Sequence, residues 1–347
     1  MSNPTEKALG NETKNNNKMT ICWVLTNNYA GIINQALGLA EQLPVKIIHK
    51  KVTLRPFWHL VSPYMTFGKK HCMTKESAPL TPPWPDLVIA AGRQAILPAL
   101  YIKEASQRKT KIVYLQDPVV HRTQFDAIVC PAHDAVKGNN IIPMIGTTHR
   151  VTPRHIAEES EKFRELFAHY PLPRIAVLIG GPNKTYTMSE TFTENLAQQL
   201  YRLQRHYGGS LLITTSRRTP PHVTQCMERV RRELGPCGYL YTGEGPSPYF
   251  ALLGWGEHIL LTCDSVCMIS ETCSTTKPVY LIPLEGRSKK FQAFHSTMLA
   301  TGRIQWFDGT LQNRLVFEPF NENIRVAQSL REAMDIEMGF LKKRSSF

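Results

Sequence analysis

Short apolar runs alternate along this chain with longer segments in which apolar residues recur every three or four positions. The short aliphatic and β-branched runs predict buried strands, and the longer periodic segments predict helices. Regular alternation of the two is typical of βαβ units, which build parallel sheets. The pattern therefore predicts an α/β protein with Rossmann-like organisation.

The first half of the chain contains one complete set of such units. Apolar residues share one face over residues 32–43, where we expect a helix. A helix over 154–167 leads to Pro171 and Pro173, which mark a connector because they cannot both lie inside a regular element. Strands are expected over residues 21–26, 45–48, 87–90, 111–115, 127–130 and 141–144.

After the connector the pattern begins again. Strands are expected over residues 174–179, 210–215, around Tyr239, 258–261 and 279–282, with helices over 189–207 and 221–234. We therefore predict a disordered leader over residues 1–18, an N-terminal Rossmann-like domain over 19–168, a C-terminal one over 169–320, and a helix and tail over 321–347. Two such lobes should face a cleft at the C-terminal ends of their strands, where open α/β sheets bind ligands.

The last predicted helix, over residues 323–341, has an apolar face that must be covered. We expect this helix to pack back on the lobes. The residues of that face are Ile324, Ala327, Leu330, Met334, Met338 and Leu341.

Charge and composition narrow the range of partners. The 41 Lys and Arg against 28 Asp and Glu give a net charge of +13, which favours anionic partners such as nucleotides, phosphorylated sugars or anionic lipids; solubility alone is the plain alternative. Every apolar run is far shorter than the roughly 18 residues of a membrane span. The polar first 18 residues lack the marks of a signal or transit peptide, so a cytoplasmic location is expected. The eight cysteines form no CxxC pair, which indicates neither a disulfide framework nor a zinc site.

One segment, residues 54–72, interrupts the βαβ rhythm. It combines large aromatic residues with Arg55, Lys69 and Lys70. Such a segment can lie on an anionic membrane surface through apolar burial and attraction to headgroups. A loop packed on its own lobe explains the composition equally well.

Glycines follow the first strand of the second lobe, in the run Gly180-Gly181-Pro182-Asn183-Lys184. Glycines let the backbone approach a ligand closely, and exposed N–H groups beside Lys184 suit a phosphate. A tight turn is the alternative, because the run lacks the spacing of a P-loop.

Two further strand ends in this lobe carry polar groups. Arginine binds phosphate in a bidentate fork, so a cluster of hydroxyls and arginines suits a diphosphate, although arginines are also common on solvated loops. That cluster is Thr214, Thr215, Ser216, Arg217, Arg218 and Thr219. Farther on, Asp264 and Ser265 begin a helix and can cap it. One to two turns in, Ser270 and Glu271 can bind a sugar or ribose diol.

The acceptor side is expected on the first lobe. Asn27, Asn28 and Gly31 follow the first strand, where amides can bond sugar hydroxyls but cannot act as a base. We place Gln35 and Arg93 on the same side. The candidate bases lie in loops on the cleft side, and each is as compatible with a structural role; they are Asp117 and His133, with Asp134 and His149 as further candidates.

Taken together, segments between Ile21 and Gly309 resemble the family that groups plant mitochondrial-fission proteins with bacterial proteins described as glycosyltransferases. The segments are LTNNYAGIINQALGLAEQL, PDLVIAAGRQ, QDP, CPAHD, HRVTP, AVLIGGPNK, TTSRRTPP and TCDSVCMISE…KPVYLIPL. The resemblance implies a GT-B-like fold with the nucleotide sugar in the C-terminal lobe and the acceptor in the N-terminal lobe. The residues assigned to the nucleotide sugar are Gly180, Gly181, Asn183, Lys184, Thr215, Ser216, Arg217, Asp264, Ser265, Ser270 and Glu271.

At one place the chain departs from that family. Relatives often have Asp-Gly where this sequence has Asn27-Asn28. If that aspartate is the base that deprotonates the acceptor, this protein is inactive or uses Asp117 or His133 instead.

Our leading hypothesis is an inverting glycosyltransferase that moves a sugar from a nucleotide-diphosphate sugar to a lipid-linked or lipooligosaccharide acceptor at the inner face of the plasma membrane. No cofactor, metal or nucleic-acid partner is expected, since no DxD-type pair stands at a suitable strand end. The alternative is a non-catalytic adaptor that retains the fold. A nucleotide-sugar epimerase ranks last, because no GxGxxG turn follows the first strand.

Overall fold

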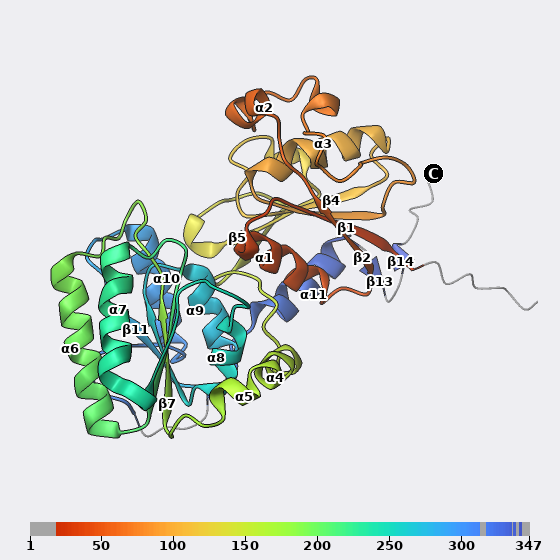
Figure 1. The fold of residues 1–347 in the computed structure, drawn as a ribbon. Helices are drawn as coiled ribbons and strands as arrows, with labels where there is room; N and C mark the ends of the chain where they lie inside the picture. The colour runs from red at the N-terminus through yellow and green to blue at the C-terminus, as the bar shows by residue number, and fades with distance from the viewer. Residues whose placement is uncertain (1–18, 313–316, 335, 338–339, 342–347) are drawn as a thin grey trace, which may run out of the picture.

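A computed structural model of the chain describes residues 19–312, 317–334, 336–337 and 340–341. The chain forms two lobes, each built on a six-stranded sheet (Figure 1). All strand pairs in both sheets are parallel. The predicted α/β class with two Rossmann-like lobes is therefore confirmed.

The first sheet has the strand order β2-β1-β3-β4-β5-β6. Its central strands are mostly apolar and almost entirely buried, as expected where helices cover both faces of a parallel sheet. The strands are β1 (Ile21–Thr26), β2 (Lys46–Lys51), β3 (Leu87–Ala91), β4 (Lys111–Leu115), β5 (Ala127–Pro131) and β6 (Ile141–Met144).

The second sheet has the order β12-β11-β10-β7-β8-β9. The order reverses beside β7 and β10, so the loops that follow these strands open a crevice at one edge of the sheet. The strands are β7 (Arg174–Ile179), β8 (Ser210–Thr215), β9 (Gly238–Tyr241), β10 (His258–Thr262), β11 (Val279–Ile282) and β12 (Gln305–Trp306).

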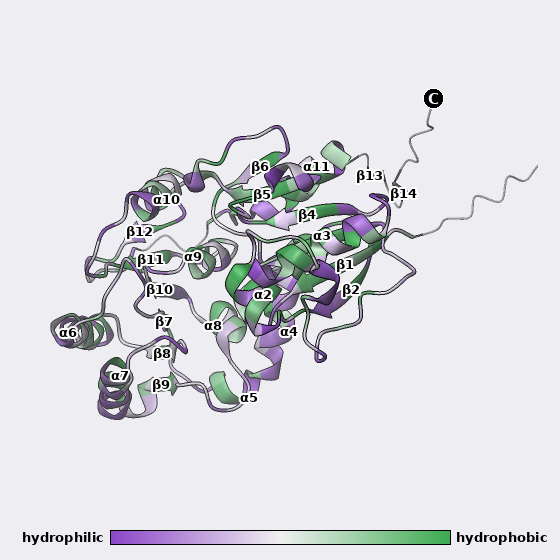
Figure 2. Cartoon of the chain, turned by 90° about the horizontal axis from the view of Figure 1, so that it is seen from above, coloured by the Kyte–Doolittle hydropathy of each residue, from purple (hydrophilic) through white to green (hydrophobic). Residues whose placement is uncertain are grey.

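Amphipathic helices cover the sheets. Figure 2 shows α6 and α7 end-on, with hydrophilic residues on their outer sides, and the Ser189 hydroxyl caps α6 by accepting from the N–H of Phe192. The helices are α1 (Ala30–Ala40), α2 (Pro56–Val61), α3 (Ile96–Ala105), α4 (Pro153–Lys162), α5 (Arg164–Phe167), α6 (Glu190–Tyr207), α7 (Pro221–Leu234), α8 (Tyr249–Trp255), α9 (Val266–Cys273), α10 (Lys289–Ala300) and α11 (Glu322–Met334). Short 3₁₀ turns are η1 (Lys69–His71), η2 (Arg93–Ala95), η3 (Arg122–Gln124), η4 (Ala132–Asp134) and η5 (Gly235–Cys237).

The chain crosses between the lobes twice. After β6, helices α4 and α5 pack on the second lobe: Phe167 lies in its core, and the indole N–H of Trp255 donates to the carbonyl of Ser160 at 2.9 Å. Near the end of the chain, α11 returns to the first lobe, where Val326 and Leu330 join the core with α1 and β3. Packing thus groups residues 153–167 with the second lobe, although they lie before the expected boundary at 168/169.

Two predicted helices differ in extent from the structure. The helix expected over 154–167 is divided at Phe163, whose φ of −109° and ψ of 16° lie outside the helical range. The last helix ends at Met334 rather than Leu341, and residues 336–337 and 340–341 instead pair as antiparallel strands β13 and β14. On α11, Ile324 is 65% exposed, so the buried face is narrower than predicted; Met338 lies outside the described residues.

Candidate functional site

Three loops meet where β7, β8 and β10 end, and Asp264 joins them. Its carboxylate accepts hydrogen bonds from the Gly181 N–H at 3.1 Å, from the Thr262 hydroxyl at 2.6 Å and from the Arg218 guanidinium at 2.8 Å. The Asp264 side chain is fully buried. A buried carboxylate with three donors is well compensated, so Asp264 fixes the relative positions of these loops.

The two glycines serve this packing directly. The N–H of Gly180 donates to the Thr262 hydroxyl at 2.8 Å, and a side chain at Gly180 would collide with the carboxylate of Asp264. A side chain at Gly181 would collide with the backbone of Arg218. The N–H groups that the sequence assigned to a phosphate are therefore engaged within the protein.

Two cations beside these loops remain available to a ligand. Lys184 and Arg217 are exposed, and neither has a hydrogen bond or ion pair among the described residues. The neighbouring Ser216 and Asn183 are held in turns: Ser216 Oγ accepts from the Arg218 N–H at 3.2 Å, and Asn183 Oδ1 accepts from the N–H groups after it. Thr215 Oγ1 donates to the Tyr241 carbonyl at 3.4 Å.

Helix α9 carries the remaining predicted donor-site residues. Ser265 caps it by accepting from the Met268 N–H at 3.3 Å. Ser270 Oγ accepts from the N–H of Thr147, a first-lobe residue, at 3.0 Å. The Glu271 carboxylate is buried and accepts from the Tyr249 hydroxyl at 2.5 Å. Burial raises the pKa of Glu271 to about 7, because desolvation penalises its charged form.

The acceptor-side predictions fall in two places. Asn27 is buried and accepts from the Tyr29 N–H at 3.0 Å, while Asn28 and Gly31 are exposed at the start of α1. Gln35 lies between the lobes and donates to Cys267 Sγ at 3.0 Å. Arg93, by contrast, donates to carbonyls at the end of α2 and supports the segment at 54–72.

The candidate bases are all held by neighbours. Arg122 donates to both oxygens of Asp117, at 2.8 and 2.7 Å, and this pairing lowers the pKa of Asp117. His133 packs on Phe294 of the other lobe, and burial lowers its pKa. His149 accepts from the Val151 N–H and lies 2.9 Å from Ser274 Oγ; burial lowers its pKa to about 4, so it is neutral and structural.

Contacts between these loops also join the two lobes. Lys290 of α10 forms an ion pair with Asp134 of η4. Gly38 of α1 lies so close to the backbone of His149 that a side chain there would collide with it. The same loop then reaches α9 through Thr147. The two lobes thus touch at several points beside these loops.

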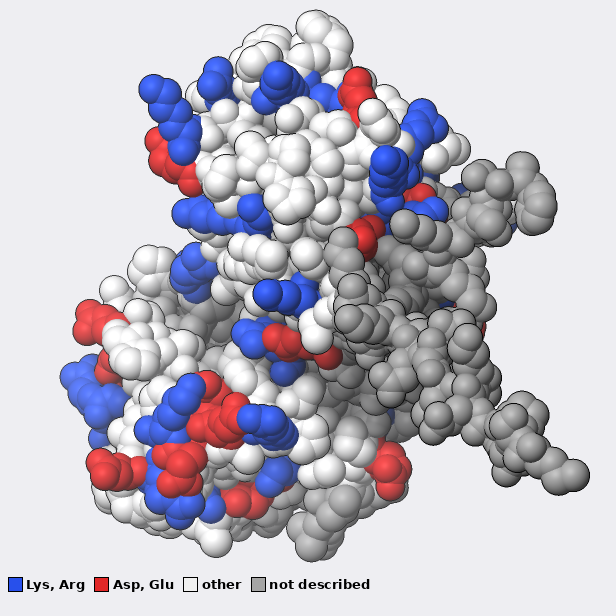
Figure 3. All heavy atoms as spheres, turned by 90° about the vertical axis from the view of Figure 1, so that its right-hand side faces the viewer, with Lys and Arg blue, Asp and Glu red and all other residues white. Residues whose placement is uncertain are grey.

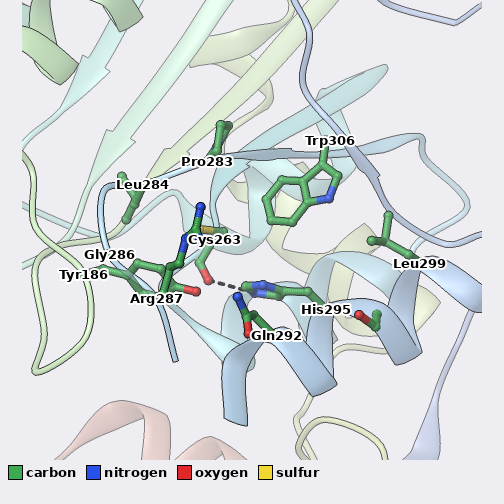
Figure 4. A pocket seen from close by; sticks show the side chains of 11 residues that line it. Tyr186, Cys263, Pro283, Leu284, Gly286, Arg287, Gln292, His295, Leu299 and Trp306 are labelled. Carbon is green, nitrogen blue, oxygen red and sulfur yellow. Dashed lines mark hydrogen bonds between the residues drawn. The ribbon is translucent and has the colours of Figure 1, made fainter. Parts of the chain in front are cut away.

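The structure contains a cavity of about 250 Å³ that the sequence did not predict (Figure 4). It lies at the ends of β10 and β11, between Trp306 and α10, and His295 donates there to the Cys263 carbonyl at 3.0 Å. The sequence contains one sign of this cavity: Gln292, His295 and Ser296 are spaced i, i+3, i+4, which places them on one face of a helix. Within the described residues no group of three His, Cys, Asp or Glu is placed to hold a metal ion.

The two facing lobes and the crevice at their strand ends define a GT-B-type α/β protein. Within that class, the chain belongs to the mitochondrial fission ELM1 family, whose model matches residues 30–334. The chain is 27% identical over 277 residues to mitochondrial fission protein ELM1 of Arabidopsis thaliana, covering 72% of this chain and 64% of that protein. It is 26% identical over 360 aligned positions to the uncharacterised protein RP120 of Rickettsia prowazekii, covering 90% of this chain and 98% of that one.

Solved structures share the fold at low identity. The UDP-GlcNAc 2-epimerase of Methanocaldococcus jannaschii matches with a TM-score of 0.55 at 13% identity, covering 90% of this chain and 99% of that one. The UDP-GlcNAc 2-epimerase of Neisseria meningitidis, bound to UDP-GlcNAc, matches with a TM-score of 0.50 at 12% identity, over 93% and 95%. The resemblance inferred from the sequence motifs is therefore confirmed at the level of family and fold.

Proposed function

We propose that this protein transfers a sugar from a nucleotide-diphosphate sugar to a lipid-linked or lipooligosaccharide acceptor. The observations that carry the proposal are the buried Glu271–Tyr249 pair of α9 and α8 and the exposed cations Lys184 and Arg217 on the loops after β7 and β8. A carboxylate in a dry site bonds strongly to a diol such as that of ribose, and two free cations match a diphosphate. Solved proteins of this fold are described in complexes with UDP-GlcNAc and with UDP.

In this proposal the second lobe binds the donor and neutralises the leaving diphosphate. Arg217 and Lys184 supply positive charge where negative charge develops, which is the usual way to stabilise such a leaving group. Arg218 has a different task, because it is committed to Asp264 and to the carbonyls of Gly181 and Pro182. The cavity beneath Trp306 provides polar groups and an aromatic ring at the same sheet edge, a combination suited to a sugar.

The acceptor hydroxyl needs a base, and Asp117 is our first choice for this step on the first lobe. Its pKa is lowered by Arg122, so it is ionised but weakly basic, and we expect slow transfer. The buried His133 is the second choice. Neither Asn27 nor Asn28 can accept a proton at neutral pH.

A non-catalytic adaptor is the second candidate, and a specific observation favours it. The N–H groups of Gly180 and Gly181 and the side chains of Asp117 and His149 are all engaged in internal contacts. These contacts stabilise the fold, and an adaptor that acts through its surface would need them without needing groups left free for a substrate. The epimerase reaction is a third outcome that the same assay can read.

The test is an assay of the full chain with a panel of UDP, GDP, ADP and CMP sugars and lipids extracted from a bacterial envelope. Transfer predicts release of the nucleotide together with a glycosylated lipid, and Asp117→Asn should reduce the rate by about 10²-fold or more. Conversion of the free donor to its epimer would indicate the third candidate. Absence of product with every donor, in a folded protein, would favour the adaptor.

A further inference from the structure

The segment at 54–72, hereafter the tip, exposes an unusual concentration of apolar side chains. Phe57 is 56% exposed, Leu60 77%, Tyr64 67% and Phe67 73%. Helix α2, which carries the first two, stands at the top of the first lobe, away from the second lobe (Figure 1). Isolated exposed apolar residues are ordinary, but four within one short segment require an explanation.

The tip is held in this shape by the lobe beneath it. At its base, Leu54 and Met73 form a β-bridge, and Arg55 Nε donates to the Met73 carbonyl at 2.9 Å. Arg93 donates to the carbonyls of Leu60 and Ser62, which end α2. The exposed side chains are therefore presented outward by a fixed scaffold.

An inner layer of the tip is packed as a small core. Trp58 is half-buried and packs against Cys72 and Leu97, whereas Phe57 and Leu60 of the same helix are exposed. In the view from above, green hydrophobic ribbon of α2 lies at the tip (Figure 2). The same short helix thus has a partner for one face and none for the other among the described residues.

The charged residues of the tip itself are all basic. No acidic residue occurs in the sequence between Glu41 and Glu76. Figure 3 shows uncharged surface at the apex of this lobe and, below it, Lys and Arg side chains with Asp and Glu side chains among them. Exposed basic residues at the base of the tip are Lys51, Arg55, Lys70 and Lys75; Lys69 is paired with Glu104 at 2.5 Å.

We propose that the tip docks the first lobe on an anionic lipid bilayer, with Phe57, Leu60 and Phe67 entering the boundary between headgroups and acyl chains. Apolar insertion combined with attraction of lysines to anionic headgroups is how peripheral proteins bind membranes. A convex apolar apex above a basic base fits a bilayer better than a protein groove, since lysine is depleted in protein interfaces. The docking is independent of sugar transfer.

The test is co-sedimentation of the full chain with phosphatidylcholine vesicles, with or without phosphatidylglycerol, in the absence of any nucleotide sugar. We expect binding to the mixed vesicles that weakens as salt is raised, because screening acts on the lysines. The triple variant Phe57→Ser, Leu60→Ser, Phe67→Ser should lower partitioning at least about tenfold. The matched triple variant Val119→Ser, Leu166→Ser, Ile324→Ser removes exposed apolar groups elsewhere and should bind as wild type.

A second variant keeps the inference falsifiable if the tip variant misfolds. Lys51→Gln, Lys70→Gln, Lys75→Gln leaves the apolar groups in place and should abolish the preference for phosphatidylglycerol. Wild-type protein that binds neither vesicle, or a tip variant that binds as wild type, would overturn the inference. So would loss of self-association in the tip variant without loss of vesicle binding, because the tip would then contact a second copy.

Discussion

The hydroxyl of Tyr249 lies 2.5 Å from Oε2 of Glu271, in a place where Glu271 is only 6% exposed. The two residues come from different helices, α8 and α9, which precede and follow β10 in the chain. Burial raises the pKa of both groups, and Glu271 reaches about 7. Glu271 therefore affects both the stability of the second lobe, through its buried ionisable group, and the donor binding proposed for this lobe.

The first prediction concerns the pH dependence of stability. Because the pKa of Glu271 is about 7 in the folded protein against its usual 4.5, the folded state binds more protons than the unfolded state between these values. This group therefore lowers the free energy of unfolding as pH rises from 4.5 to 7, by roughly 3 kcal/mol. Relative to wild type, Glu271→Gln should gain about that amount between pH 5 and pH 8 in denaturant titrations. If the difference in the free energy of unfolding between wild type and Glu271→Gln were the same at pH 5 and pH 8, the raised pKa of Glu271 would be contradicted.

The second prediction concerns the buried carboxylate that joins the three loops. Asp264→Ala leaves the Gly181 N–H and the Thr262 hydroxyl without an acceptor, and should lower the free energy of unfolding by roughly 2–4 kcal/mol. Loss of the Arg218 ion pair adds little to this loss of stability, because the Arg218 side chain is 47% exposed and can be hydrated instead.

The matched control is Asp117→Ala, which removes a carboxylate paired with Arg122 near the surface. Its side chain is 21% exposed and that of Arg122 41%, so the expected loss is about 1 kcal/mol or less. Chemical denaturation of both variants provides the comparison. Equal losses would mean that Asp264 does not hold the loops together.

The third prediction uses two glycines of one helix. Gly38→Ala places a methyl group against the backbone of His149, where the loop between the lobes packs on α1, and should cost about 1–3 kcal/mol. Gly31→Ala, in the first turn of the same helix, meets nothing within 4 Å and should stabilise by up to about 1 kcal/mol. Thermal unfolding should show a lower Tm for Gly38→Ala and a higher Tm for Gly31→Ala. Shifts of the same sign in both variants would contradict the contact between Gly38 and His149.

The sequence predicted the sheets well because parallel strands are apolar on both faces. Strand β3 and the centre of β10 are apolar runs, and such runs are recognisable without knowledge of their neighbours. Strand β12 was missed because a two-residue edge strand has no periodic pattern. Helix α10 was missed because its face is mixed, with the cavity residue Gln292 exposed and His295 buried.

The sequence predicted which strand ends carry the polar loops of the candidate site, but not the contacts within them. Sequence order placed Gly180, Arg217 and Glu271 near one sheet edge, since strand ends of a parallel sheet meet there. It could not show that Asp264 would take the Gly181 N–H, or that Arg122 would engage Asp117, because such bonds depend on side-chain positions. The partner of Glu271, Tyr249, comes from a helix that no sequence pattern tied to the site.

The central claim is that the second lobe binds a nucleotide-diphosphate sugar beside Glu271. Isothermal titration of the full chain with UDP, GDP, ADP and CMP sugars tests it directly, with Glu194→Gln on α6 as a control for an exposed carboxylate. We predict that at least one donor binds, that Glu271→Ala weakens its binding by about 10–100-fold, as expected for loss of a charged hydrogen bond, and that Glu194→Gln leaves it unchanged. Absence of binding by every donor, or equal binding by wild type and Glu271→Ala, would contradict the account.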